Sequence, residues 1–178
     1  MTKIERRTSE TTVRVVLGVG TGIAKISTGV LFLDHMMSAL ARYSGMDMEI
    51  SATGDLKHHT IEDVAIALGE SFARVLPTKC ARYGASTVPM DEALVEVTID
   101  AGGRPYYRGP LPSSLYEHWM RSFADNAKMT LHIRVLRGTD RHHIVEAAFK
   151  ALGFAIRQAL VETDAVFSTK GSVTLDAV

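Results

Sequence analysis

The sequence repeats itself at about half its length, and this repeat limits the folds open to the chain. Residues 57–70 read KHHTIEDVAIALGE, and residues 141–153 read RHHIVEAAFKALG. In both segments a basic residue precedes two adjacent histidines, a glutamate follows three residues after the second histidine, and the sequence continues to Ala-Leu-Gly. Because the segments lie 84 residues apart in a chain of 178, the sequence predicts two similar halves.

Hydrophobic periodicity predicts the same order of elements, β-β-α-β-α, in both halves. In the first half, the pattern favours strands at 11–18, 22–28 and 46–53 and helices at 30–45 and 58–76. In the second half, it favours strands at 93–100, 104–109 and 129–136 and helices at 113–127 and 141–161. Residues 86–90 and 172–176 could add a closing strand to the first and second half, respectively.

The helices at 58–76 and 142–160 carry apolar residues over much of their circumference, which is typical of helices buried between layers. We therefore expect an α+β protein with internal pseudo-symmetry and without a Rossmann-type parallel sheet. A single domain would span residues 1–178, made of two repeats at about 1–84 and 85–178.

The composition excludes several classes of protein. A hydrophobic fraction of 46% supports a folded core, and 20 basic residues balance 20 acidic ones, which argues against a general nucleic-acid or anionic-membrane binder. One cysteine, Cys80, excludes an intrachain disulfide and a thiolate-dominated metal site. Because no signal-peptide core or membrane-length apolar run is present, we expect a cytoplasmic protein.

The histidine pairs are candidate metal ligands. On a helix, His58 and Glu62 lie four residues apart on one face, whereas His59 lies about 100° further round and is better placed for another ion. The same holds for the second pair and its glutamate. Imidazole and carboxylate without thiolate suit manganese, iron, zinc, cobalt or nickel, and two divergent pairs suggest two ions. The alternative is two pairs of surface histidines at helix starts.

Three further histidines could complete such sites. His35 and His118 occupy near-equivalent places in the repeat, and His132 stands alone in an expected strand. Spacing does not choose among them. For a phosphate group, Lys170 with the Ser168 hydroxyl, and Arg104 with Arg108, could supply charged donors. The alternatives are an exposed turn and a solvated edge strand.

Six sequence segments, taken together and in this order, are specific to one protein family. They read TGVLFLDHMMSALARYSGMDMEI, HHTIEDVAIALGE, PMDEAL, GGRPY, TLHIRVLRGTDRHHIVEAAFKALG and STKG. Together they resemble the imidazoleglycerol-phosphate dehydratases of histidine biosynthesis, from about Arg7 to Gly171. The resemblance implies helices packed between two four-stranded sheets, two manganese ions per active site, and sites lying between subunits. It also implies a homo-oligomer, with trimers assembling into a cage of twenty-four subunits.

The resemblance also implies roles for particular residues. The implied metal ligands are His35, His58, His59, Glu62, His132, His142, His143 and Glu146. The implied catalytic carboxylates are Glu146, Glu10 and Glu62, and the implied phosphate-binding residues are Arg104, Arg108, Ser168 and Lys170. The implied reaction is the dehydration of imidazole glycerol phosphate to imidazole acetol phosphate. Ala39 and Tyr43 stand where the family usually carries glutamine and histidine near the substrate phosphate.

Two other functions fit the same histidine pattern. One is a metal-binding paralogue that keeps the cage and has lost the reaction. Glu10, Arg104 and Lys170 argue against it, because an assembly motif does not need them. The other is a dimetal hydrolase, which would release free phosphate instead of a ketone.

Overall fold

The structure is a computed structural model, and it describes residues 1–165. The first half comprises β1 (Thr2–Arg7), β2 (Thr11–Val19), β3 (Ala24–Ser27), α1 (Leu31–Ser44), β4 (Met46–Gly54) and α2 (Lys57–Val75). The second comprises β5 (Tyr83–Met90), β6 (Ala93–Asp100), β7 (Tyr106–Arg108), α3 (Ser114–Asn126), β8 (Thr130–Arg137) and α4 (Arg141–Ala159). The predicted order β-β-α-β-α is found in both halves, preceded in each by one further strand, β1 or β5, and α1 ends where Gly45 adopts a left-handed conformation.

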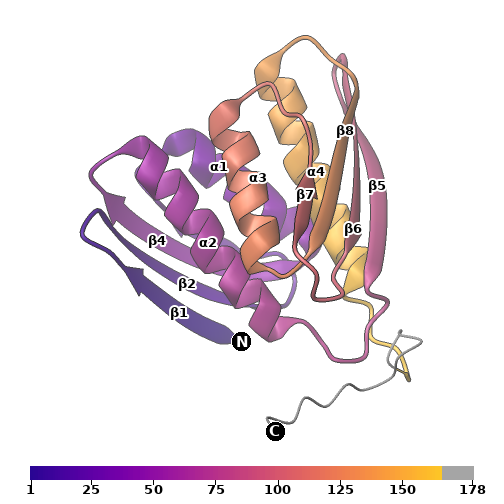
Figure 1. Cartoon of the computed structure of the whole chain (residues 1–178), viewed down its shortest axis with the longest axis horizontal. Coiled ribbons are helices and arrows are strands. Elements are labelled where there is room, and N and C mark those ends of the chain that lie inside the picture. Colours follow the sequence, from indigo (N-terminus) through magenta and orange to yellow (C-terminus); the bar gives the residue numbers. More distant parts are fainter. Residues whose placement is uncertain (166–178) are drawn as a thin grey trace, which may run out of the picture.

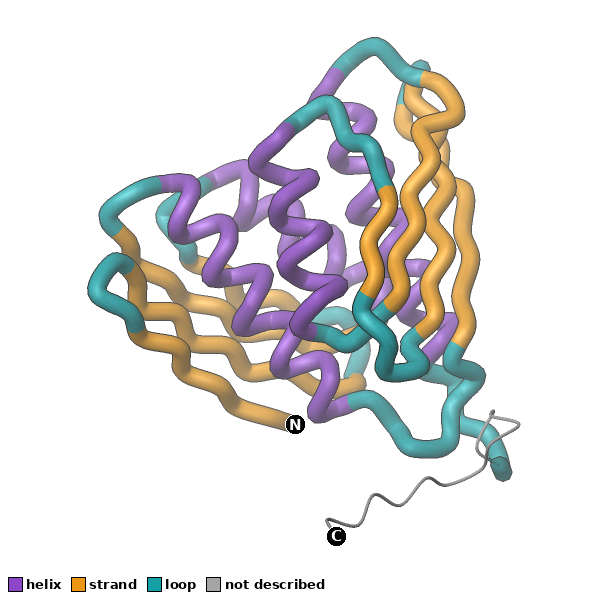
Figure 2. The backbone as a smooth tube through the Cα atoms, viewed as in Figure 1, coloured by secondary structure: helices purple, strands orange, loops and turns teal. Residues whose placement is uncertain are grey.

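Two sheets of identical topology enclose the helices (Figure 1). Their strand orders are β1-β2-β4-β3 and β5-β6-β8-β7, and only the last pair of each sheet is parallel. Figure 2 shows the helices as a layer between the two sheets. The predicted α+β class, with two pseudo-symmetric halves and helices between four-stranded sheets, is therefore confirmed.

Alternation within the strands explains why each sheet covers the helices with one face. In β2, Val13, Val15 and Leu17 are buried, while Thr12, before Val13, and Arg14, between Val13 and Val15, are exposed. Such alternation is typical of antiparallel sheets with one solvated face. Between the sheets, the Trp119 ring of α3 lies 4.7 Å from the Phe149 ring of α4, centroid to centroid, and both side chains are fully buried.

One expectation about the sheets is wrong. Residues 86–90 do not close the first half, because they belong to β5 and pair with β6 in the second sheet. The turn at Asp91 and Glu92 joins these two strands directly, which favours local antiparallel pairing. The first sheet instead begins with β1, whose sequence TKIERR shows no apolar alternation because it is an edge strand. The segment 172–176 lies outside the described residues.

The repeated glycine of the Ala-Leu-Gly segment allows helices to pack closely. A Cβ atom on Gly69 of α2 would lie 2.7 Å from the Phe123 carbonyl oxygen of α3. On Gly153 of α4, it would lie 3.0 Å from the Ser44 amide nitrogen of α1. The repeat thus preserves two equivalent helix contacts, α2 with α3 and α4 with α1, and each contact joins the two halves.

We expect Gly69→Ala to destabilise the protein. In an unobstructed helix this change stabilises by roughly 0.5–1 kcal/mol, but overpacking costs about 1–3 kcal/mol and here meets rigid backbone. Urea unfolding of the variant measures the sign directly. Asp125→Ala, at an exposed position of α3, is the control and should stay within about 0.5 kcal/mol of the parent. A more stable Gly69→Ala variant would contradict the packing explanation.

Candidate active site

The first histidine of each pair contacts the glutamate one turn further along its helix, as predicted. The distance from His58 Nε2 to Glu62 Oε2 is 3.6 Å in α2, and the distance from His142 Nε2 to Glu146 Oε2 is 3.1 Å in α4. Residues four apart share a helix face, so this arrangement follows from local structure alone.

A histidine from the other half of the chain completes each cluster. Because α1 packs on α4, His35 Nε2 lies 3.2 Å from Glu146 Oε2. Because α3 packs on α2, His118 Nε2 lies 3.4 Å from Glu62 Oε1. His58, Glu62 and His118 each offer a ligand atom within 4.8 Å of the others. The resemblance implied a role for His35 and none for His118, whereas the structure gives both the same relation to a glutamate.

The two clusters differ in how firmly their carboxylates are held. Glu146 is 5% exposed, and its Oε1 lies 2.8 Å from Lys150 Nζ. Burial alone would raise the pKa of Glu146, but Lys150 and His35 together bring it below the ordinary value. Glu62 is more open, with 33% of its side chain exposed, and Ile66 stands where the repeat places Lys150.

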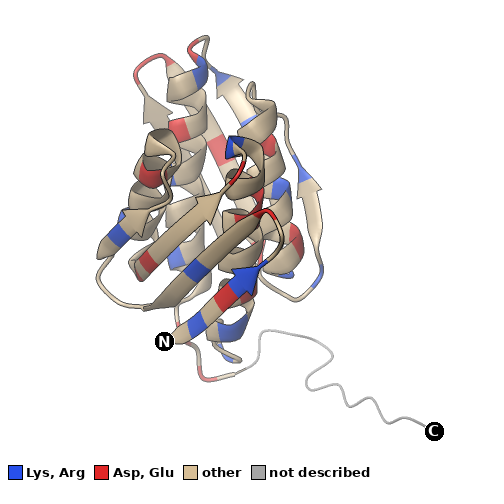
Figure 3. Cartoon of the chain, turned by 90° about the vertical axis from the view of Figure 1, so that its left-hand side faces the viewer, with Lys and Arg blue, Asp and Glu red and all other residues tan. Residues whose placement is uncertain are grey.

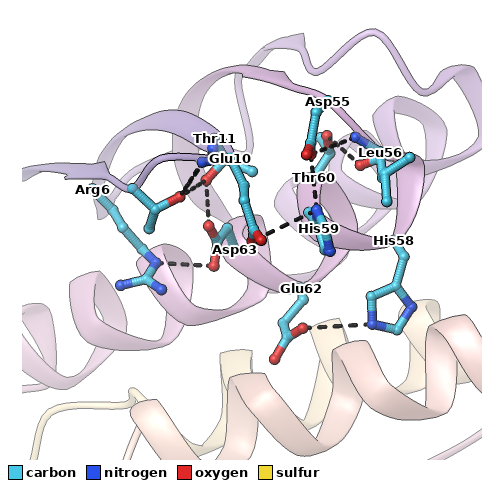
Figure 4. A network of polar contacts seen from close by, with 11 residues as sticks. Arg6, Glu10, Thr11, Asp55, Leu56, His58, His59, Thr60, Glu62 and Asp63 are labelled. Carbon is cyan, nitrogen blue, oxygen red and sulfur yellow. Dashed lines mark hydrogen bonds and ion pairs between the residues drawn. The ribbon is translucent and has the colours of Figure 1, made fainter.

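The second histidine of the first pair faces different carboxylates. His59 Nδ1 lies 2.8 Å from Asp55 Oδ1 and 3.6 Å from Glu10 Oε2 (Figure 4). The hydrogen bond with Asp55 raises the pKa of His59. The two histidines of the first pair thus diverge towards different carboxylates.

The second pair repeats this divergence with a different partner. His143 Nδ1 lies 2.7 Å from Glu92 Oε2, in the turn between β5 and β6. The other oxygen of Glu92 accepts hydrogen bonds from the amides of Asp140, at 2.8 Å, and Thr139, at 3.1 Å. These amide bonds and the His143 contact lower the pKa of Glu92 to about 2, and Glu92 in turn raises the pKa of His143.

Glu92 should therefore make the stability of the metal-free protein depend on pH in the acid range. A carboxylate whose folded pKa is depressed stabilises the fold above its ordinary pKa, and this stabilisation is lost as the pH falls from 4.5 towards about 2. We expect Glu92→Gln to unfold at lower urea than the parent at about pH 6, with the difference shrinking by about pH 3. Glu49→Gln, an exposed change of the same kind, should show no such pH dependence. A constant difference would contradict the assignment.

A buried carboxylate anchors the loop that carries Glu10. Asp63, in α2, accepts a hydrogen bond from Arg6 Nε at 3.0 Å and another from the Thr11 hydroxyl (Figure 4). The loop between β1 and β2 is thereby fixed over the start of α2. Glu10 lines a pocket of about 320 Å³ at this loop.

The structure does not bring all the predicted site residues together. His132, on β8, lies opposite Arg108 of β7, and its ring centroid is 5.5 Å from that of Tyr106. Arg104 is mostly exposed, with NH2 3.9 Å from Asp100 Oδ2. Ser168 and Lys170 lie outside the described residues. Ala39 is buried, and the Tyr43 ring packs 5.0 Å from that of Phe154.

Sequence reasoning missed three side chains that touch these clusters, Lys150, Asp55 and Glu92, and it left His118 open as one of three candidate histidines. Lys150 had a signal, since it lies four residues after Glu146 on the same helix face. His118 also had one, as the repeat counterpart of His35. The two acids had none, because their positions depend on loop and turn geometry.

The surface agrees with the charge balance. In the ribbon of Figure 3, the positions of Lys and Arg are interspersed with those of Asp and Glu. Within residues 1–165, no helix has both the length and the apolar character needed to span a bilayer.

The donor atoms of the clusters fit a divalent transition metal. Imidazole nitrogens converge on carboxylate oxygens in both, and the buried thiol of Cys80 lies elsewhere, beside the bridge to Glu162. This donor set suits manganese, iron, zinc, cobalt or nickel. The fold and clusters define a class of twofold-repeated α+β proteins whose polar centres combine histidines and carboxylates from both halves.

Comparison with known proteins gives the family. The family profile described as Imidazoleglycerol-phosphate dehydratase matches residues 28–156. The enzyme of that name from Clostridium botulinum (strain Hall) is 44% identical, covering 96% of this chain and 97% of its own. For that of Nautilia profundicola, the identity is 45%, covering 97% and 100%. The crystal structure of the Pyrococcus furiosus protein superposes with a TM-score of 0.87 at 41% identity, covering 96% and 100%. The chain belongs to the imidazoleglycerol-phosphate dehydratase family, whose members are hydro-lyases.

Proposed function

We propose that the protein catalyses the metal-dependent dehydration of imidazole glycerol phosphate to imidazole acetol phosphate in histidine biosynthesis. The observation that carries this proposal is the pair of histidine–glutamate clusters, each assembled from both halves, with the exposed carboxylate of Glu10 beside one of them. Membership of the dehydratase family supports the same reaction.

The metal sites would draw on the implied ligands, and manganese is the ion we expect, with two per active site. The proposed ligands are His35, His58, His59, Glu62, His132, His142, His143 and Glu146. A bound divalent ion supplies Lewis acidity towards the imidazole ring and hydroxyl group of the substrate. The half-exposed rings of His35, His58 and His142 can reach such an ion from the surface.

The reaction removes a proton from carbon and a hydroxyl group from the neighbouring carbon, and the enol product then becomes a ketone. The three carboxylates proposed to carry the proton are Glu10, Glu62 and Glu146, each of which contacts a histidine of the clusters. Glu146, held by Lys150, is fixed in position, while the more exposed Glu10 is free to meet a substrate. Arg104, Arg108, Ser168 and Lys170 are the proposed phosphate-binding residues.

We also propose that the active protein is a cytoplasmic homo-oligomer of trimers that assemble into a cage of twenty-four chains. The pocket beside His142 has a volume of about 210 Å³, below the roughly 300 Å³ at which ligand sites begin. Leu31, near this site, is 85% exposed. A neighbouring chain would cover such a surface and enclose the substrate. Light scattering on the manganese-loaded protein should give the mass of the cage, and a monomer would contradict this proposal.

The test of the function is direct. The manganese-loaded protein is incubated with imidazole glycerol phosphate, and the enolised ketone is followed by absorbance, with a metal-stripped sample as the control. We expect ketone only with metal. Release of free phosphate would indicate the hydrolase, and neither product from a metal-loaded assembly would indicate the paralogue without activity.

A further inference from the structure

The two second histidines, His59 and His143, present the same ring nitrogen to a carboxylate. The Nδ1 atom lies 2.8 Å from Asp55 in one case and 2.7 Å from Glu92 in the other. An ionised carboxylate can only accept hydrogen bonds, so a contact this short places the hydrogen on Nδ1. In the neutral ring, Nε2 then keeps its lone pair and is the atom left to bind a metal.

Among residues 1–165, no contact as short as these holds the opposite nitrogen of either ring. His143 Nε2 lies 3.4 Å from Asp91 Oδ2, which exceeds the about 3.2 Å of an ordinary hydrogen bond, and the Asp91 side chain is mostly exposed. In metal sites generally, a carboxylate on the second ring nitrogen fixes both the tautomer and the ring orientation.

The two acids come from different places in the repeat. Glu92 lies in the β5–β6 turn, whose counterpart in the first half is the β1–β2 loop that carries Glu10. If both halves used the equivalent carboxylate, Glu10 would make the short contact with His59 Nδ1. Instead Asp55, at the start of α2, makes the short contact, and Glu10 remains 3.6 Å away with 53% of its side chain exposed (Figure 4).

We propose that Asp55 and Glu92 are positioning residues, which hold the Nδ1 hydrogens of His59 and His143 so that each Nε2 faces a metal ion. We further propose that Asp55, by taking this task in the first half, leaves the carboxylate of Glu10 available to the substrate. This inference rests on the proposed metal-dependent function. The difference between the two halves then has a chemical consequence. Of the two equivalent carboxylates, Glu92 holds a histidine, and Glu10 is available to the substrate.

The first test uses Asp55→Asn and Glu92→Gln, which keep shape but can also donate to Nδ1 and so permit the other tautomer. Manganese affinity of the metal-stripped full chain is measured by competition with a chelating dye. We expect each variant to bind manganese about 10- to 100-fold more weakly. Asp125→Asn, the same chemical change at an exposed position of α3, should bind like the parent. Unchanged affinity in both variants overturns the inference, and a parent that binds no manganese overturns the proposed function as well.

A second measurement does not depend on the variants. Solid-state nitrogen NMR of the metal-free parent, with labelled histidine, reports which ring nitrogen carries the hydrogen. We expect Nδ1–H for His59 and His143, each signal being assigned by its change in the matching variant. Hydrogen on Nε2 of both rings would overturn the proposal.

The release of Glu10 is tested by a double-mutant cycle with Asp55→Asn and Glu10→Gln. If Glu10 replaces Asp55 as the partner of His59 when Asp55 is changed, the losses of manganese affinity will exceed the sum of the single losses. Additive losses would overturn this part of the proposal.

Discussion

Glu146→Gln is expected to remove most of the dehydratase activity, lowering kcat/KM by about 100- to 10,000-fold. Glu146 receives contacts from His142 and His35 and an ion pair from Lys150, so its charge organises the whole cluster. Glutamine has the same shape and should preserve the fold. The loss would therefore reflect the missing charge and proton-carrying capacity, as steady-state assays with imidazole glycerol phosphate can measure.

The control for this prediction is Glu49→Gln, the same change on the exposed face of the first sheet. Elemental analysis of both variants separates the two proposed roles of Glu146. Lost activity with lost manganese would assign it mainly to metal binding, and lost activity with full manganese would assign it to proton transfer. Full turnover with full manganese content would contradict both proposed roles of Glu146.

The fold was predictable from sequence because most of its determinants are local. The alternation of Val13, Val15 and Leu17 gives a strand, and apolar periodicity with Gly45 at the end gives α1. The repeat then indicates that the two halves share a topology. Strand β1 was not predicted, because its sequence TKIERR is that of a charged edge strand and lacks the alternation of apolar residues.

The contacts of the candidate site were predictable from the sequence only where both residues lie on the same helix. The contact between His142 and Glu146 follows from a spacing of four residues. The contact between His118 and Glu62 does not, because it requires α3 to pack on α2 across the boundary between the halves. That packing depends on the close approach at Gly69, a long-range property that residue spacing does not encode.

Partners in loops were the least predictable part of the site. Asp55 and Glu92 reach equivalent histidines from a helix start and a strand turn, so the repeat gives no common pattern by which to find them. Their contacts are evident only in the folded structure, where the Nδ1 atoms of His59 and His143 lie beside these two carboxylates. In the same geometry, Asp55 and Glu92 make short contacts with imidazole rings, whereas Glu10 lies 3.6 Å from the His59 ring.

Glu10→Gln should lower kcat by about 100- to 10,000-fold while leaving manganese affinity and content unchanged. His59 is held by Asp55 at 2.8 Å, so the metal site should not need the Glu10 charge, which lies 3.6 Å from the same nitrogen. The loop itself should also survive, because Asp63 holds it through Arg6 and Thr11. Turnover and manganese titration of the same preparation measure the two quantities together.

The contrast with Asp55→Asn makes the Glu10 prediction specific. Asp55→Asn should weaken manganese binding, so its manganese content should fall together with its activity. Glu10→Gln should keep its manganese and stay slow at any concentration of the ion. If Glu10→Gln instead lost manganese in step with activity, Glu10 would be a metal ligand, and proton transfer would fall to Glu62 or Glu146. Only a carboxylate that acts on the substrate and leaves the metal site intact can separate turnover from metal content in this way.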